Sequence, residues 1–554
     1  MIRDDAVQQV PVPGSAQDQP VEPPTRGATA ATRRGARLPA LTRRDAGPAA
    51  LVVAFGVLTF LVVRTALVDD AYITMSYARN VGLHGTWGLL SDVPSNAATS
   101  PAWVLLLSAT TAVVRNTIVA LGLLHVLMLL TAFLALRATA RRTGLPSWVA
   151  PVGVVLVAVN PLVMSTVGLE TELLVTLVTC LLAAGTAGRP VVFGLVAGLV
   201  FLTRMDTAFA VALFPLFFPA VLRRLHVVVG VALAVVVPWA WWSWLHLGSV
   251  LPDTLLIKSG QHSWGGYDVG NGWGWWLQFD SRLVVLAAWG PMAAGAVAAV
   301  GLVYVAARGA RLRLRPWIAL AVAGAVHWET LSLINVPPYH WYFGLAISAG
   351  TLTVVAFTGA LTAGATGSQG VAPRVVGSRV VAARGVAAAV CAVLLATFCY
   401  VDAAQPAKGS LAPSDRAALP WRVAPIQSNW MTSAAYDAMG RDLRRLLTAP
   451  DGTVQRVSAF GEIGHLAYVC DCLVDGFADP ALLEPAVAEL RERSSPLRRS
   501  LLDLDHRYRD TGQRPVPLAG HLVYMPSPQV PPPGAPSWPV DLNPGGGSIV
   551  LLRG

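Results

Sequence analysis

The chain has 554 residues, of which 54% are hydrophobic and only 13% are charged. Its mean hydropathy of +0.55 excludes an ordinary soluble globular protein, and several apolar runs approach the ~20 residues that cross a bilayer. The formal net charge of +10 comes largely from arginines that flank these runs, a pattern that indicates cytoplasmic loops and argues against a nucleic-acid partner.

Residues 1–47 are polar and proline-rich, and they lack the apolar stretch of a cleavable signal peptide. The segment ends in a cluster of arginines between Arg33 and Arg44. We predict a disordered cytoplasmic N-terminal arm over residues 1–47. A transmembrane domain over residues 48–402 and a soluble domain over residues 403–554 follow it.

The arginine clusters also predict the topology, because cytoplasmic loops carry an excess of positive charge. Assigning them to the cytoplasm gives a polytopic α-helical protein of the plasma membrane with about 11 spans. The N-terminus is then cytoplasmic and the C-terminal domain extracytoplasmic. The predicted spans are residues 49–68, 117–136, 147–160, 172–187, 190–203, 207–222, 227–247, 283–306, 316–335, 341–362 and 385–401. Residues 101–114 are interpreted as an interfacial or re-entrant helix, since a crossing there would turn Arg137 to Arg142 outward.

Two adjacent acids, Asp69 and Asp70, directly follow the first apolar run. A carboxylate at or near hydrocarbon depth is costly and usually serves a function. The apolar runs 148–159 and 191–202 are too short to span a bilayer, and charged residues follow each of them. Such short helices imply non-helical backbone at membrane depth, which is tolerated where it lines a cavity. The predicted topology collects the following groups in one extracytoplasmic cavity: Asp69, Asp70, Glu170, Glu172, Arg204 and Asp206.

Five motifs in sequence order resemble those of the GT-C fold glycosyltransferases. The motifs are Asp69-Asp70-Ala71-Tyr72, Ser95-Asn96-Ala97-Ala98-Thr99, Gly168-Leu169-Glu170-Thr171, Thr203-Arg204-Met205-Asp206 and Leu251-Pro252-Asp253-Thr254 through Lys258. The pattern is most similar to the actinobacterial group that includes the terminal arabinofuranosyltransferases of mycobacterial cell-envelope synthesis. The resemblance implies transfer of a sugar, preferably arabinofuranose, from a polyprenyl-phosphate donor to a polysaccharide or glycolipid acceptor outside the cytoplasm. A transporter or flippase of lipid-linked saccharides is the alternative, although the chain shows no internal repeat.

The proposed reaction needs one carboxylate base, because the leaving phosphate is already an anion. Asp69 is the candidate catalytic base. Asp70 either tunes it, binds an acceptor hydroxyl or holds a divalent cation such as Mg²⁺, Mn²⁺ or Ca²⁺. No spacing of histidines and acids matches a known metal cage. The alternative interpretation is that the Asp69-Asp70 pair only marks a helix end at the interface.

Arg204 and Lys258 are candidates to bind the donor phosphate, Arg204 because a guanidinium grips phosphate oxygens through two hydrogen bonds. Arg204 can equally pair with Asp206, and Lys258 can equally be an interfacial lysine. The candidates for contact with the sugars are Glu170, Asp206, His327, Glu329, His340 and Tyr342. His327 and Glu329 are two residues apart and are therefore expected on different faces of one helix.

The composition becomes more polar after residue 402, which predicts a small domain of mixed helices and strands. Residues 457–460 and 466–469 are predicted strands around a Gly461–Gly464 turn. Residues 481–493 are a predicted amphipathic helix. Cys470 and Cys472 are not expected to pair with each other, because alternating residues of a strand have poor disulfide geometry. A disulfide from one of them to Cys399 is the alternative.

Overall fold

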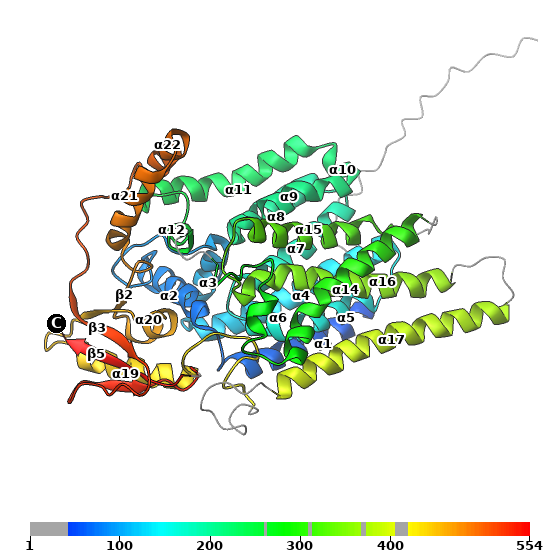
Figure 1. The fold of residues 1–554 in the computed structure, drawn as a ribbon. Helices are drawn as coiled ribbons and strands as arrows, with labels where there is room; N and C mark the ends of the chain where they lie inside the picture. The colour runs from blue at the N-terminus through cyan, green and yellow to red at the C-terminus, as the bar shows by residue number, and fades with distance from the viewer. Residues whose placement is uncertain are drawn as a thin grey trace, which may run out of the picture. The chain divides into compact units, whose positions relative to one another are not determined.

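The computed structural model describes residues 43–259, 263–307, 313–366, 373–404, 419–543 and 545–553. Most of the predicted N-terminal arm therefore lies outside the described residues, and residues 43–47 open the first helix. The described chain forms a helical bundle followed by a smaller part that contains a sheet (Figure 1).

Six described helices are long and apolar enough to cross a membrane. They overlap six of the predicted spans, which confirms the polytopic helical class. They are α1 (Arg43–Val63), α4 (Thr117–Thr143), α11 (Leu225–His246), α14 (Arg282–Ala307), α16 (Gly344–Thr366) and α17 (Pro373–Ala404).

Other predicted spans correspond to shorter helices: α5 (Val149–Ala158), α7 (Thr171–Thr186), α8 (Pro190–Thr203) and α15 (Arg315–Leu333). The span predicted over residues 207–222 is not one continuous helix, because the segment is broken into short helical turns. Pro215 and Pro219 lack the N–H groups that a continuous helix would need. The turns are η1 (Met205–Thr207), α9 (Ala208–Leu213), η2 (Phe214–Phe217) and α10 (Pro219–Leu222).

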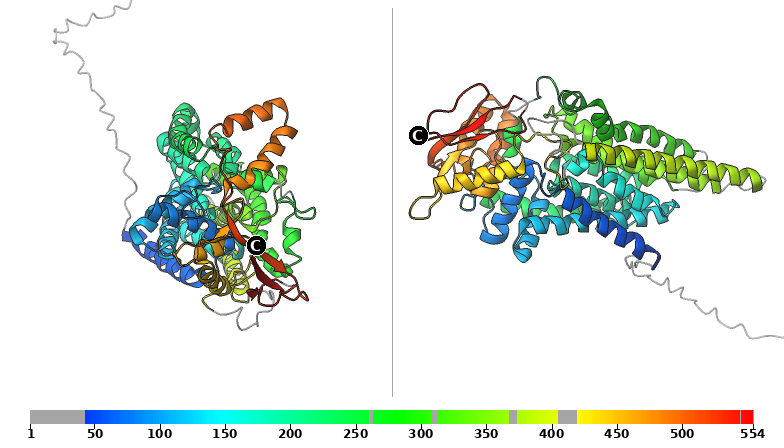
Figure 2. Two further views of the ribbon diagram at one scale, coloured as in Figure 1. Left: turned by 90° about the vertical axis from the view of Figure 1, so that its left-hand side faces the viewer. Right: turned by 90° about the horizontal axis from the view of Figure 1, so that it is seen from below.

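Close helix packing in the bundle depends on small residues. A Cβ atom added to Gly295 of α14 would lie 2.3 Å from the Cα atom of Gly350 of α16, so the two backbones touch at glycines. Helices α16 and α17 lie side by side (Figure 2). The segment predicted to be interfacial forms α3 (Pro101–Val114), which packs against α2 (Asp69–His84). Short helices in the connections are α6 (Pro161–Ser165), α12 (Thr254–Ser259), α13 (Trp273–Trp276) and η3 (His340–Phe343).

The C-terminal part contains the predicted mixture of helices and strands. Its five-stranded sheet has the order β2-β1-β3-β5-β4, in which β1 is parallel to β2 and β3 while β5 is antiparallel to β3 and β4. The strands are β1 (Arg456–Ser458), β2 (Leu473–Val474), β3 (Leu518–Met525), β4 (Ser537–Pro539) and β5 (Ser548–Arg553). The helices are α19 (Ser433–Leu447), α20 (Gly464–Cys470), η4 (Pro480–Leu483), α21 (Glu484–Arg493) and α22 (Pro496–Asp505). The predicted helix over residues 481–493 is confirmed by η4 and α21.

Two sequence predictions for this part are wrong. Residues 466–469 lie in helix α20 instead of a strand, because a carboxylate from α2 binds the first N–H groups of this helix. Cys470 and Cys472 form a disulfide, with Cα atoms 5.1 Å apart. The prediction assumed a strand, whereas Asp471 between them has a left-handed backbone conformation that turns the chain back on itself.

Candidate active site

Three of the predicted charged residues meet at the end of the bundle where α8 finishes and α7 begins. Glu170 immediately precedes α7, and Arg204 follows α8 in an extended conformation. These two short helices pack together and run in opposite directions, so their polar ends coincide. The cavity beside them has a volume of about 180 Å³, and its polar or aromatic lining includes Thr99, Glu170, Arg204, Asp206, Thr254 and Tyr342.

The guanidinium of Arg204 is buried between two carboxylates. Its Nη1 donates to Oε1 of Glu170 at 2.7 Å, and its Nε donates to Oδ1 of Asp206 at 3.1 Å. The Nη2 group also binds Asp206. The ring of Tyr342 lies under the guanidinium, 4.8 Å from its central carbon. Arg204 is thus held in one orientation by an ion-pair network and an aromatic face.

The net charge of the Glu170–Arg204–Asp206 cluster disfavours binding of an anion such as a phosphate. One guanidinium faces two carboxylates, so the described groups carry a net negative charge unless a further cation joins them. His327 is the nearest described candidate, because its Nε2 lies 3.4 Å from Oδ1 of Asp206. The pairing of Arg204 with Asp206, left open by the sequence, is what the structure contains. Binding of a donor phosphate would require rearrangement of this pairing or a second cation.

The remaining predicted residues are dispersed. Glu329 is exposed on α15 while His327 is buried, which confirms that they occupy different faces. His340 is buried with its ring centre 5.6 Å from that of Trp276 and does not line the cavity. Lys258 lies in α12, but its side chain is outside the described residues. Among the described residues, no group of three or more histidines, cysteines and acids is arranged to hold a metal ion.

Asp69 was predicted to share this cavity, but it is not among the lining residues and instead binds the C-terminal part of the chain. Its Oδ2 accepts a hydrogen bond from the backbone N–H of Gly464 at 2.9 Å, and its Oδ1 accepts one from His465 at 2.8 Å. The carboxylate therefore caps the N-terminus of α20, a favourable position for a negative charge. Burial raises the pKa of Asp69 above its usual value, although both backbone hydrogen bonds act in the opposite direction.

Further contacts fix α20 against α2. The rings of Tyr72 and His465 stack with their centres 3.7 Å apart, and His465 Nε2 lies 2.9 Å from Oδ1 of Asp437. The guanidinium of Arg79 lies 4.8 Å from the centre of the Tyr468 ring. The paired acids of α2 therefore lie at an interface between the bundle and the C-terminal part.

This interface contains acidic residues that sequence reasoning missed. Glu462, which the sequence placed only in a turn, accepts hydrogen bonds from the backbone N–H of Trp430. Burial, followed by the charges of Asp69 and Asp70, raises the pKa of Glu462 well above its usual value. The only sequence signal was an acid next to two glycines, which does not reveal a partner almost 400 residues away. Four carboxyl groups thus influence one another here: Asp69, Asp70, Glu462 and Asp475.

Asp475 gives this interface a testable pH dependence. Burial, with a smaller contribution from the charge of Asp69, raises the pKa of Asp475 from 3.8 to about 6. The folded state therefore holds this proton more tightly than the unfolded chain does. The resulting stabilisation is complete below pH ~4 and is lost as the pH rises through about 6.

We expect Asp475→Asn to remove this pH-dependent loss of stability, because asparagine does not titrate. Between pH 4 and pH 7, the free energy of unfolding of the wild type should fall by about 2 kcal/mol relative to the variant. Unfolding in detergent, followed by tryptophan fluorescence across this range, measures the difference. Curves that stay parallel for the two proteins would contradict the assignment.

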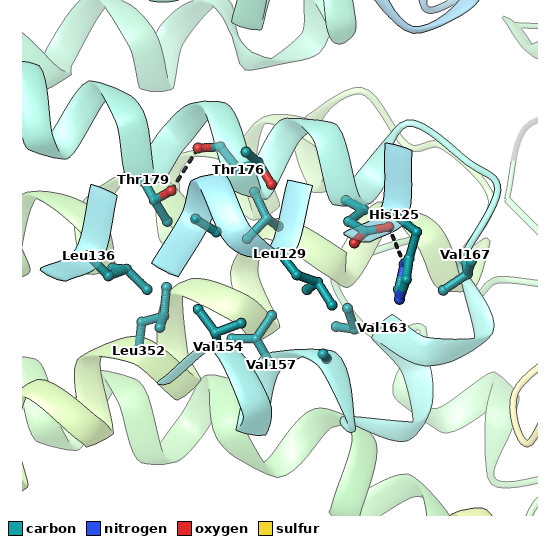
Figure 3. A pocket seen from close by; sticks show the side chains of 14 residues that line it. His125, Leu129, Leu136, Val154, Val157, Val163, Val167, Thr176, Thr179 and Leu352 are labelled. Atoms are coloured by element: carbon teal, nitrogen blue, oxygen red, sulfur yellow. Dashed lines mark hydrogen bonds and ion pairs between the residues drawn. The ribbon is translucent and has the colours of Figure 1, made fainter. Parts of the chain in front are cut away.

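A separate polar group lies inside the bundle. Nδ1 of His125 lies 2.9 Å from Oε2 of Glu172, and Nε2 lies 2.9 Å from the hydroxyl of Thr59. These residues come from α4, α7 and α1. His125 and Glu172 border a cavity of about 40 Å³ with otherwise mostly apolar walls (Figure 3). The prediction that Glu172 joins the outer cavity is therefore wrong, because it lines this inner cavity and binds His125.

The chain has the GT-C-like polytopic helical fold that the sequence predicted, with a small C-terminal sheet. The chain is similar to ArnT from Cupriavidus metallidurans bound to undecaprenyl phosphate, with a TM-score of 0.53 and 13% sequence identity over 91% of this chain and 98% of that one. It also matches the apo oligosaccharyltransferase from Archaeoglobus fulgidus, with a TM-score of 0.49 and 12% identity over 86% of this chain and 69% of that one. No protein-family model and no curated protein sequence matches the chain.

Proposed function

We propose that this protein is a membrane glycosyltransferase that uses a polyprenyl-phosphate-linked sugar. Its acceptor is a cell-envelope polysaccharide or glycolipid on the extracytoplasmic side of the plasma membrane. The observation that carries the proposal is the buried Glu170–Arg204–Asp206 cluster beside a cavity in a GT-C fold. Undecaprenyl phosphate bound to ArnT, a protein of similar fold, supports a lipid phosphate as the carrier.

The acceptor hydroxyl must lose a proton as it attacks the anomeric carbon, and the polyprenyl phosphate leaves as an anion. We assign the base to Asp69. The proposed role of Asp70 is to tune this base, to bind the acceptor or to hold a divalent cation. Both oxygens of Asp69 accept backbone hydrogen bonds from α20. Catalysis by Asp69 therefore requires α20 to withdraw, so that the acceptor hydroxyl replaces at least one of these N–H donors.

Arg204 and Lys258 are the proposed ligands of the donor phosphate. Since Arg204 is already paired with two carboxylates, the positive charge of Lys258 or of a divalent cation would offset the negative charge of the cluster. Glu170, Asp206 and Tyr342 border the same cavity and are placed to contact sugar hydroxyls or the sugar face. His327, Glu329 and His340 are retained as candidates for the wider substrate site. Arabinofuranose as the donor sugar rests on the sequence resemblance alone.

Purified protein incubated with a panel of polyprenyl-phosphate sugars tests this proposal. We expect free polyprenyl phosphate and a new glycosidic bond with one donor, identified by mass spectrometry, and arabinofuranose is the first donor to try. A parallel assay in vesicles measures movement of the donor between leaflets. Movement of an intact donor without any new bond would overturn the transferase and favour a flippase.

A further inference from the structure

A second cavity lies one helix length away from the proposed transfer site. It borders Gly185 and Thr186 at the end of α7, whereas Glu170 directly precedes the start of that helix. The 16 residues of α7 correspond to ~24 Å of helix, so the cavity is at the opposite end of the bundle. Its volume is about 640 Å³, which falls in the usual range of ligand sites.

This cavity is strongly basic. Arg142 from the end of α4 lines it together with Arg313, which precedes α15, and Arg315, the first residue of α15. No acid is among its lining residues. Arg189 is close enough to Arg142 for their charges to repel. Guanidinium groups gathered in this way are unfavourable without an anion between them.

Other arginines at this end of the bundle have acidic partners, in contrast to the arginines that line the cavity. Arg137 and Arg141, on the same end of α4, both form ion pairs with Asp45. In the described part of the chain, Arg142, Arg313 and Arg315 have no carboxylate within ion-pair distance. The only side-chain hydrogen bond seen for Arg142 is donated to the carbonyl of Ala138 in its own helix, at 3.3 Å. Most of its donors therefore remain available to a ligand.

Other walls of the cavity are apolar. Phe217, Phe218 and Leu314 line it beside the arginines. A ligand that satisfies both surfaces has an anionic head and a hydrocarbon body. Basic pockets between helices at a membrane surface suit lipid phosphates in this way, since arginine binds phosphate oxygens through paired hydrogen bonds.

We propose that this cavity binds the phosphate headgroup of an anionic membrane lipid, with its acyl chain along Phe217 and Phe218. The site is separate from the proposed transfer site and does not depend on the proposed function. Inorganic phosphate shares the headgroup chemistry but lacks the acyl chain, so it distinguishes a lipid site from a site for a soluble anion.

Lipid binding to the full-length protein in a zwitterionic detergent tests the proposal. The probes are phosphatidylglycerol, phosphatidylcholine and inorganic phosphate, and the readouts are native mass spectrometry and thermal unfolding. We expect wild type to prefer phosphatidylglycerol and the variant R142Q/R313Q/R315Q to bind it roughly 100-fold more weakly. The control R223Q/R224Q changes exposed arginines that follow α10 and do not line the cavity, and should bind like wild type.

The milder variant Arg315→Gln removes one exposed arginine and keeps the test valid if the triple variant misfolds. It should weaken phosphatidylglycerol binding by about fivefold. Unchanged affinity in the triple or single variant would overturn the site. An equal increase in Tm with inorganic phosphate and with phosphatidylglycerol would overturn the proposal of a lipid site and assign the cavity to a soluble phosphate compound.

Discussion

Replacing Asp69 by Asn is expected to lower the rate of sugar transfer at least ~100-fold, the usual scale for loss of a general base. The substitution keeps the size of the side chain but removes its charge and its capacity to accept a proton. It also places an amide NH₂ group against one of two backbone N–H donors, from Gly464 or His465. The transfer rate and donor affinity of purified variant and wild type, at matched expression, measure the effect.

A second variant separates proton abstraction from the capping of α20. A Cβ atom on Gly464 would lie 2.0 Å from the carbonyl oxygen of Asp69, so Gly464→Ala forces α20 away from α2 without altering the carboxylate. Alanine is intrinsically better than glycine in a helix, so any loss arises at this contact. Gly230→Ala is the matched control, because nothing lies within 4 Å of a Cβ atom there.

The comparison of these variants decides the role of Asp69. If the carboxylate is the base, Asp69→Asn lowers transfer at least ~100-fold, whereas Gly464→Ala retains a much larger share of transfer with a changed pH profile or KM. If the carboxylate only holds the C-terminal part in place, both variants expose α20 to proteolysis or hydrogen exchange to the same degree and lose the same fraction of transfer. The second pattern would refute the assignment of Asp69 as base.

Local sequence patterns predicted those parts of the molecule that local physics determines. Apolar run lengths located the long helices, and a proline after Ser100 fixed the start of α3 at Pro101. The two short apolar runs correctly placed Glu170, Arg204 and Asp206 together. This worked because antiparallel neighbouring helices bring their polar ends to the same side of the bundle.

Contacts between distant segments were beyond such patterns. Residues 466–469 have strand-like composition, but the Asp69 carboxylate stabilises them as the helix α20. The Cys470–Cys472 disulfide depends on the left-handed conformation of Asp471 at the end of that helix. Glu172 faces His125 and not Arg204, because two residues of helix rotate a side chain to another face. In each case the local structure or the binding partner was determined by a contact between distant segments or by the direction in which a helix presents a side chain.

Replacing Arg204 by Met is expected to abolish transfer and to lower the free energy of unfolding by about 3–5 kcal/mol, because Glu170 and Asp206 lose their buried counter-ion. Arg204→Lys should recover only part of both, since one ammonium group lacks the planar fork that binds the two acids. The neutral variant Glu170→Gln/Arg204→Met/Asp206→Asn removes the unpaired charges and should regain stability without regaining transfer. Thermal unfolding and transfer assays on the same preparations separate the two effects. Full transfer by the neutral variant would show that the cluster only holds α7 and α8 together, and the proposed site would have to lie elsewhere.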